Sequence, residues 1–128
     1  MIDTDRMTEI KIGGEKFSLI LTTRAVKEIA AKYGSLEVIG EKMSNSKDIA
    51  STFSELIWLI VLLANQAILI HNYKNPNEKK ELLTEEFVEL MTTPQDIVKI
   101  NSVLAKTLTI GTKRNVLGEE STKNVKTE

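Results

Sequence analysis

The chain has 128 residues, no cysteine, and 17 basic against 18 acidic side chains. This length suffices for one domain with a hydrophobic core but not for two, and the lack of cysteine excludes disulfides and thiolate metal sites. The near-zero net charge argues against a nucleic-acid-binding protein, which normally carries a clustered basic excess.

The N-terminal segment, residues 1–7, is polar and lacks the basic-then-apolar pattern of a signal peptide. We therefore expect a flexible leader and a cytoplasmic protein. Residues 8–21 then predict a β-hairpin, because two strand-like runs flank Gly13-Gly14. Glycine readily supplies the positive φ angles that a two-residue hairpin turn requires.

Pairing across this turn places Ile12 opposite Glu15 and Ile10 opposite Phe17. Strand side chains alternate between the two faces of a sheet, so one face of the hairpin is apolar. A lone hairpin is only marginally stable in water, and we expect this face to pack on helices or on another subunit. The apolar face is predicted to hold Ile10, Ile12, Phe17, Leu19 and Leu21.

The first helix is predicted over residues 24–33, with Thr22 or Thr23 as the N-cap. Gly34 follows at the position where a left-handed residue commonly ends a helix. A short second helix is predicted to start at Ser35 and to extend to about Met43. The first helix has apolar residues at helical spacing, which predicts a buried stripe of Val26, Ile29, Ala30 and Tyr33.

The central segment, residues 53–70, is the most apolar part of the chain and contains its only tryptophan. We predict a helix over residues 47–73, apolar on every side from Leu56 to Ala64. Such a helix is either the buried centre of a bundle or a membrane span. The apolar run covers about 15 residues, short of the ~20 that a bilayer needs, which favours the buried helix. Its widening apolar surface predicts a second half enclosed by several neighbours.

The following segment, residues 77–81, is charged and predicts a surface loop. Thr84 is expected to cap a short helix over residues 85–91. The apolar residues of that helix predict that it turns inward Phe87, Leu90 and Met91.

Thr93-Pro94 begins the last predicted helix, with a capping hydroxyl and a proline at the first helical position. Its apolar residues recur at helical spacing, and Gly111 is expected to end it. Residues 112–128 mix charges without a period and predict a disordered tail, which leaves residues 8–111 as the single domain. The buried stripe is predicted to be Ile97, Ile100, Leu104 and Leu108.

The polar residues within the apolar segment offer little catalytic chemistry. His71 is the only histidine, and no partner of metal-binding or catalytic spacing lies near it in sequence. Asn65 and Gln66 interrupt the apolar run. They either fix the register of a packed interface through hydrogen bonds or lie on a face that reaches solvent, and the sequence leaves both open. We predict a non-enzymatic protein without a cofactor or metal.

The order of elements resembles a known family. A hairpin, Glu9–Leu21, leads directly into a helix, Thr23–Gly34; a long apolar helix and a charged loop then precede Leu83-Thr-Glu-Glu-Phe87. In this order the chain is similar, over residues 8–110, to the tail assembly chaperones of long-tailed bacteriophages and of prophages in Gram-positive bacteria.

The resemblance implies a non-catalytic protein that is made in the bacterial cytoplasm and is absent from the mature virion. It implies binding of the tape measure protein, which is kept soluble, and recruitment of tail tube subunits during tail assembly. Members of the family form rings or helical assemblies, so the resemblance also implies a homo-oligomer. It carries over no catalytic residues, nucleic-acid binding or membrane role.

On this basis we hypothesise self-association through the hairpin and the central helix. The tape measure protein would contact exposed positions among Phe17, Leu19, Ile57, Leu59 and Leu63, and Asn65 and Gln66 would also lie in partner or oligomer contacts. Three alternatives remain: another small phage protein such as a head–tail connector or a regulatory adaptor, a membrane-associated protein that uses residues 53–70, and an enzyme with an unrecognised site.

Overall fold

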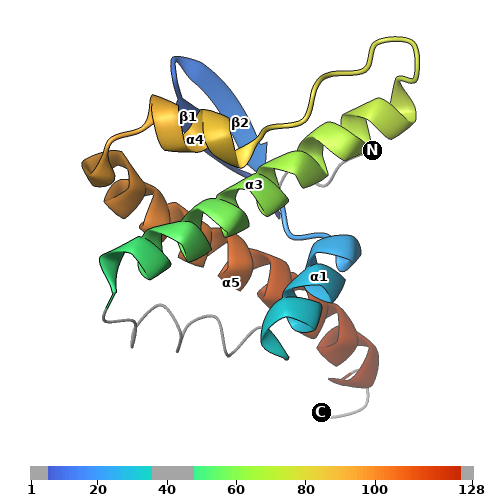
Figure 1. Ribbon diagram of the computed structural model, residues 1–128. Coiled ribbons are helices and arrows are strands. Elements are labelled where there is room, and N and C mark those ends of the chain that lie inside the picture. The colour runs from blue at the N-terminus through green and yellow to red at the C-terminus, as the bar shows by residue number, and fades with distance from the viewer. Residues whose placement is uncertain (1–5, 36–47, 125–128) are drawn as a thin grey trace.

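The computed structural model describes residues 6–35 and 48–124, with side chains described as far as residue 111 (Figure 1). The fold is mainly helical, with an N-terminal hairpin and one long apolar helix, α3, that contacts α1, β2, α4 and α5. This confirms the predicted fold class. The leader up to residue 5 and most of the predicted helix at residues 35–43 lie outside the described residues. In chain order the elements are β1 (Thr8–Ile12), β2 (Glu15–Leu19), α1 (Thr23–Tyr33), α3 (Ile49–Lys74), α4 (Glu85–Met91) and α5 (Pro94–Asn124).

The hairpin has the predicted register, with Ile10 opposite Phe17 in an antiparallel pair. The turn glycines have φ angles of 59° and 82°, as the two-residue turn requires. The second strand ends at Leu19 rather than Leu21, and the alternation of faces ends there too. Ile20 and Leu21 are both buried, and the Ile20 N–H donates to the carbonyl oxygen of Leu63 at 3.3 Å. The sequence pattern did not predict burial of Ile20.

Helix α1 begins and ends as predicted. The Thr22 hydroxyl accepts a hydrogen bond from the Ala25 N–H at 3.0 Å, and Gly34 ends the helix with a φ of 96°. Of the predicted buried stripe, only Ile29 is buried: Val26 and Tyr33 are half-buried against the core and Ala30 is exposed. Ala25, which was not predicted, is buried instead. Ala25 and Ile29, four residues apart, lie on the face of α1 that packs on the core, whereas Ala30 faces away from the core.

Helix α3 crosses the centre of the molecule, but its burial is uneven along its length (Figure 1). Its buried residues all lie between Leu56 and Gln66. Residues 67–72 are only half-buried, and Tyr73 is 89% exposed. The prediction that the second half is enclosed by several neighbours is therefore wrong. The neighbouring elements pack on the middle of α3 and leave its last turns only partly covered.

The core is one cluster built from every described element. Each of these elements contributes at least one almost completely buried side chain, and α3 contributes the largest share of the cluster. Trp58 packs at the border of this cluster, where its ring meets that of Tyr33 edge-on at 5.9 Å and lies 4.6 Å from the Lys32 ammonium. Both contacts tie α1 to α3.

Helix α4 is capped by Thr84 as predicted, through a bond from the Phe87 N–H to the hydroxyl at 3.1 Å. Its orientation is not as predicted. Val88 is the buried residue, Phe87 is half-buried, and Leu90 and Met91 are 72% and 46% exposed. This helix of two turns lies beside the hairpin, where the Phe87 ring meets that of Phe17 edge-on at 6.2 Å, so only one narrow line of side chains can be covered.

Helix α5 starts with the predicted cap. The Thr93 hydroxyl accepts from the Asp96 N–H at 3.2 Å, and the Thr93 N–H donates to the Asp96 carboxylate at 2.9 Å. Three of the four predicted core residues are buried, and Leu108 packs against the core in a half-buried position. Thr107 is also fully buried. Its hydroxyl lies 2.6 Å from that of Thr8, which joins α5 to β1.

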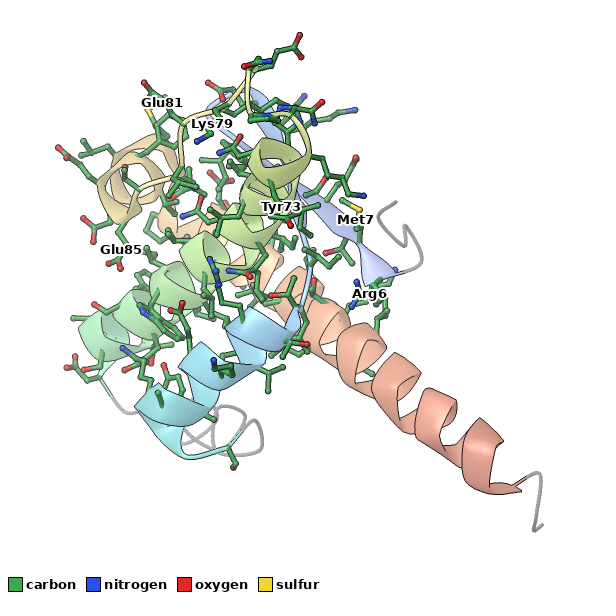
Figure 2. All side chains as sticks on the ribbon, turned by 90° about the vertical axis from the view of Figure 1, so that its right-hand side faces the viewer. Arg6, Met7, Tyr73, Lys79, Glu81 and Glu85 are labelled. Atoms are coloured by element: carbon green, nitrogen blue, oxygen red, sulfur yellow. The ribbon has the colours of Figure 1, made fainter. Side chains whose placement is uncertain are left out.

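The predicted end of α5 at Gly111 is wrong, as is the structureless tail over residues 112–124. The helix is continuous to Asn124, and Figure 2 shows its C-terminal end extending away from the other elements. Gly111 is a packing residue instead. A β-carbon at this position would lie 2.7 Å from the Leu21 β-carbon, so a side chain there would collide with the segment that follows β2. A glycine inside a helix and a glycine after its end look alike in sequence.

Candidate partner-binding surface

The residues predicted to contact a partner are mostly part of the core. Leu19, Ile57, Leu59 and Leu63 are all buried within the chain, and of the five apolar candidates only Phe17 is half-exposed. They are therefore not the exposed positions that the hypothesis requires. The sequence shows that these residues are apolar, but it does not show which of them are already covered by the chain itself.

Asn65 forms a two-way hydrogen bond with the backbone of Leu83. Its Oδ1 accepts from the Leu83 N–H at 2.7 Å, and its Nδ2 donates to the Leu83 carbonyl oxygen at 2.9 Å. The side-chain amide thus pairs with both backbone groups of one residue, as the facing residue of an antiparallel strand would. Of the two alternatives left open by the sequence, hydrogen bonding inside a packed interface is the one observed, and the interface lies within this chain.

Asn72 repeats this arrangement seven residues, or two helical turns, further along α3. Its Oδ1 accepts from the Lys80 N–H at 2.8 Å, and its Nδ2 donates to the Lys80 carbonyl oxygen at 3.0 Å. Between the two, His71 Nε2 lies 2.9 Å from the carbonyl oxygen of Glu78. These contacts hold the segment between α3 and α4 along the helix. The sequence signal was the spacing of the two asparagines, which pattern analysis missed.

Gln66 joins the start of α1 to α3. Its Oε1 accepts a short hydrogen bond from the Thr22 hydroxyl, and its Nε2 donates to the Leu62 carbonyl oxygen at 3.2 Å. Gln66 is buried, and both ends of its amide have partners. The same Thr22 hydroxyl caps α1, so one hydroxyl links the helix start to the centre of the molecule.

Substituting alanine for Asn65 is expected to lower the free energy of unfolding by about 2 kcal/mol. Two hydrogen bonds to Leu83 are lost, and its backbone groups stay partly buried without partners. Amide exchange at Leu83 is expected to accelerate more than exchange in the middle of α3. Hydrogen exchange followed by NMR measures both. Ser54→Ala, at an exposed position of the same helix, is the matched control, and equal exchange at Leu83 in both variants would contradict the role assigned to Asn65.

Two grooves flank the half-exposed C-terminal turns of α3. The first, which we call the basic groove, has a volume of about 570 Å³ and lies between α3, the start of α1 and the loop after α3. The second, which we call the mixed groove, has a volume of about 640 Å³ and lies between α3, the hairpin and the same loop. The basic groove is lined by Thr22, Arg24, Gln66, Leu69, Ile70, Asn72, Tyr73, Lys74 and Lys79.

Apart from these grooves, the described residues offer little for chemistry. No group of three or more His, Asp or Glu side chains within the described part of the chain could hold a metal ion. The carboxylates of Glu85, Glu86 and Glu89 are exposed on α4, where the first two lie in the first turn and suit the helix dipole.

Comparison of the chain with protein-family models, with curated proteins and with solved structures returned no match. The functional interpretation therefore depends on the surface of this chain and on the arrangement of its elements. The deciding features are the exposed last turns of α3 and the grooves on either side of them.

Proposed function

We propose that this protein is a tail assembly chaperone of a bacteriophage or prophage. In this role it binds the tape measure protein in the cytoplasm of the bacterial host, keeps it soluble, and helps to recruit tail tube subunits. It leaves the tail before the virion is mature. The proposal joins the resemblance in element order to a surface that suits the binding of an apolar partner.

The observation that carries the proposal is the incomplete cover of α3. The most apolar helix of the chain is buried in its middle but leaves residues 67–72 half-buried and Tyr73 exposed, with a groove on each side. Exposed apolar surface of this kind marks interaction sites in soluble proteins. A chaperone that masks apolar segments of a partner needs such a surface on a stable scaffold.

Self-association remains part of the proposal, but the hairpin contributes less to it than the sequence suggested. Its apolar face is covered by the chain itself, since Ile10, Ile12 and Leu19 are buried. Homo-oligomer contacts would therefore use large apolar side chains that the fold leaves exposed. Among the described residues outside α3, the exposed large apolar side chains are Leu82, Leu90, Met91 and Val98.

Co-expression with the tape measure protein encoded in the same gene cluster tests the proposal. We expect a soluble complex that elutes together in gel filtration, whereas the tape measure protein alone is insoluble. Co-expression with an unrelated small helical protein is the control. A tape measure protein that stays insoluble, with this chain eluting alone, would contradict the proposal and favour a connector or adaptor.

A second candidate function is membrane association, which one observation favours. Among the described residues, α3 is the one helix long and apolar enough to cross a membrane, and 44% of its most apolar 18-residue window is buried inside the protein. The core helix of a soluble protein meets the same criterion. Recovery of the protein in the membrane pellet after high-speed centrifugation, resistant to salt and carbonate washes, would support this candidate over the chaperone.

A further inference from the structure

We propose that the basic groove binds an amphipathic helix of the partner whose apolar ridge is flanked by acidic side chains. This inference rests on the proposed function, since it assigns a partner chemistry to one part of the same surface. It concerns the groove between α3 and α1 rather than the mixed groove on the other side of α3. Three features of the lining residues support it.

The first feature is the spacing of the groove's floor. Gln66, Leu69, Ile70 and Tyr73 lie at i, i+3, i+4 and i+7 of α3 and all line the basic groove. Side chains at this spacing form one continuous face of a helix, the kind of face against which a second helix packs. Gln66 is buried at the inner end of this face, Leu69 and Ile70 are half-buried, and Tyr73 is exposed. The face is thus apolar and open toward solvent.

The second feature is the charge around that face. Arg24, Lys74 and Lys79 line the groove, and the described lining includes no acidic residue. None of the three has an ion pair or side-chain hydrogen bond within the described part of the chain. Figure 2 shows Tyr73 on α3 and Lys79 on the loop above it, on the same side of the molecule. The rim therefore carries three exposed positive charges that an acidic partner could approach.

Arg24 adds to this argument through its place in α1. It lies in the first turn of that helix, which has no acidic residue, although a positive charge there opposes the helix dipole. Its guanidinium therefore adds to the positive potential at the end of the groove without stabilising the helix. An acidic partner residue would be attracted by both the side chain and the dipole.

The third feature is the contrast with the mixed groove. That groove is of similar size and also borders α3, but its lining includes two acidic residues, Glu15 and Glu81, beside two basic ones, Lys16 and Lys80. Because these positive and negative charges balance, the mixed groove does not favour an acidic partner over a basic one. Of the two grooves that flank the C-terminal turns of α3, only the basic groove combines an apolar floor with a single sign of charge. A partner with an apolar ridge and acidic flanks complements both properties.

The test uses two synthetic helical peptides of about 20 residues with the same apolar ridge. One carries glutamate at the flanking positions and the other carries lysine. Each is labelled with a fluorophore, and its binding to the full chain is measured by fluorescence anisotropy at low and at moderate salt. We expect the glutamate peptide to bind at least about tenfold more tightly than the lysine peptide, with an affinity that falls as salt is raised. A single-stranded oligonucleotide is the third probe, and it is expected to bind more weakly because it lacks an apolar ridge.

The variant Lys74→Glu/Lys79→Glu should reverse this preference, with a loss of about tenfold for the glutamate peptide and a gain for the lysine peptide. Lys16→Glu/Lys80→Glu makes the same change of charge in the mixed groove and should leave the preference as it is. All four lysines are exposed, and circular dichroism checks that each variant is folded. Tyr73→Ser should weaken both peptides, since it removes the exposed end of the apolar face.

Each outcome decides the inference. Equal binding of the two peptides, a preference unchanged in Lys74→Glu/Lys79→Glu, or tightest binding of the oligonucleotide would overturn it. The proposed function is judged separately by co-expression. If Lys74→Glu/Lys79→Glu solubilises the tape measure protein as well as the native chain does, the basic groove is not the binding site, but the proposed chaperone function stands. If the glutamate peptide binds in the basic groove but the native chain does not solubilise the tape measure protein, the groove inference stands and the proposed chaperone function is rejected.

Discussion

Leu63→Ala is expected to lower the free energy of unfolding by about 3–4 kcal/mol, the largest effect that we predict for a single substitution. The Leu63 side chain is fully buried in the middle of α3, and alanine would leave a cavity among the core residues around it. Its carbonyl oxygen also accepts from the Ile20 N–H, so the cavity would open where the chain leaves the hairpin. A domain of this size is stable by only about 5–15 kcal/mol, so the loss is a large fraction of the total.

Urea denaturation followed by fluorescence of Trp58, the only tryptophan, measures this effect. Ile49→Ala is the matched control, because Ile49 is an aliphatic residue of the same helix that is 72% exposed. The control should change stability by less than about 0.5 kcal/mol. Equal effects of the two substitutions would mean that Leu63 is not a core residue and would revive the hypothesis that it contacts a partner.

Gly111→Ala is expected to lower the free energy of unfolding by about 2 kcal/mol, although helix propensity alone predicts the opposite sign. Inside a helix, alanine is favoured over glycine by about 1 kcal/mol. Here the new β-carbon would lie 2.7 Å from the Leu21 β-carbon, which is attached directly to the backbone and has no rotamer by which to move away. The backbone of α5 or of the segment after β2 must shift, and overpacking of this kind costs about 1–3 kcal/mol.

Asn101→Ala is the matched control for this prediction, since Asn101 lies in the same helix at an exposed position. It should leave stability unchanged or raise it by a few tenths of a kcal/mol. The same denaturation measurement applies. A Gly111→Ala protein more stable than the native chain would show that Gly111 is not in close contact with Leu21, and the path of α5 beyond this residue would then need revision.

The partner surface predicted from the sequence and the one proposed from the structure differ because burial is a property of the whole fold. Partner contacts were predicted at the most apolar residues of the hairpin and α3, and most of these residues are buried by the chain itself. Half-exposed residues such as Leu69 and Ile70 belong to the same apolar segment, and the sequence does not distinguish them from the buried residues. Their partial exposure arises because the other elements pack on the middle of α3 and not on its last turns.

The sequence by itself determined the local structure of this protein. Gly13-Gly14 supplied the positive φ angles of a two-residue hairpin turn, and this turn fixed the strand register. The capping hydroxyls of Thr84 and Thr93 and the long apolar run placed the starts of α4 and α5 and both ends of α3 to within a few residues. Backbone caps, turn angles and hydrophobic periodicity act over four to seven neighbouring residues, so these boundaries can be predicted from local sequence.

Only the tertiary structure decided what these elements do to one another. Gly111, predicted to end a helix, contacts Leu21 instead, and Asn65 and Asn72 have backbone partners in the loop after α3. Tyr73 is exposed beside three cations that have no ion pair within the described part of the chain. Each of these features joins residues that are distant in sequence or depends on where cover by other elements ends. Local sequence patterns do not show which distant residues meet in the fold, so the candidate surface could be identified only from the packed structure.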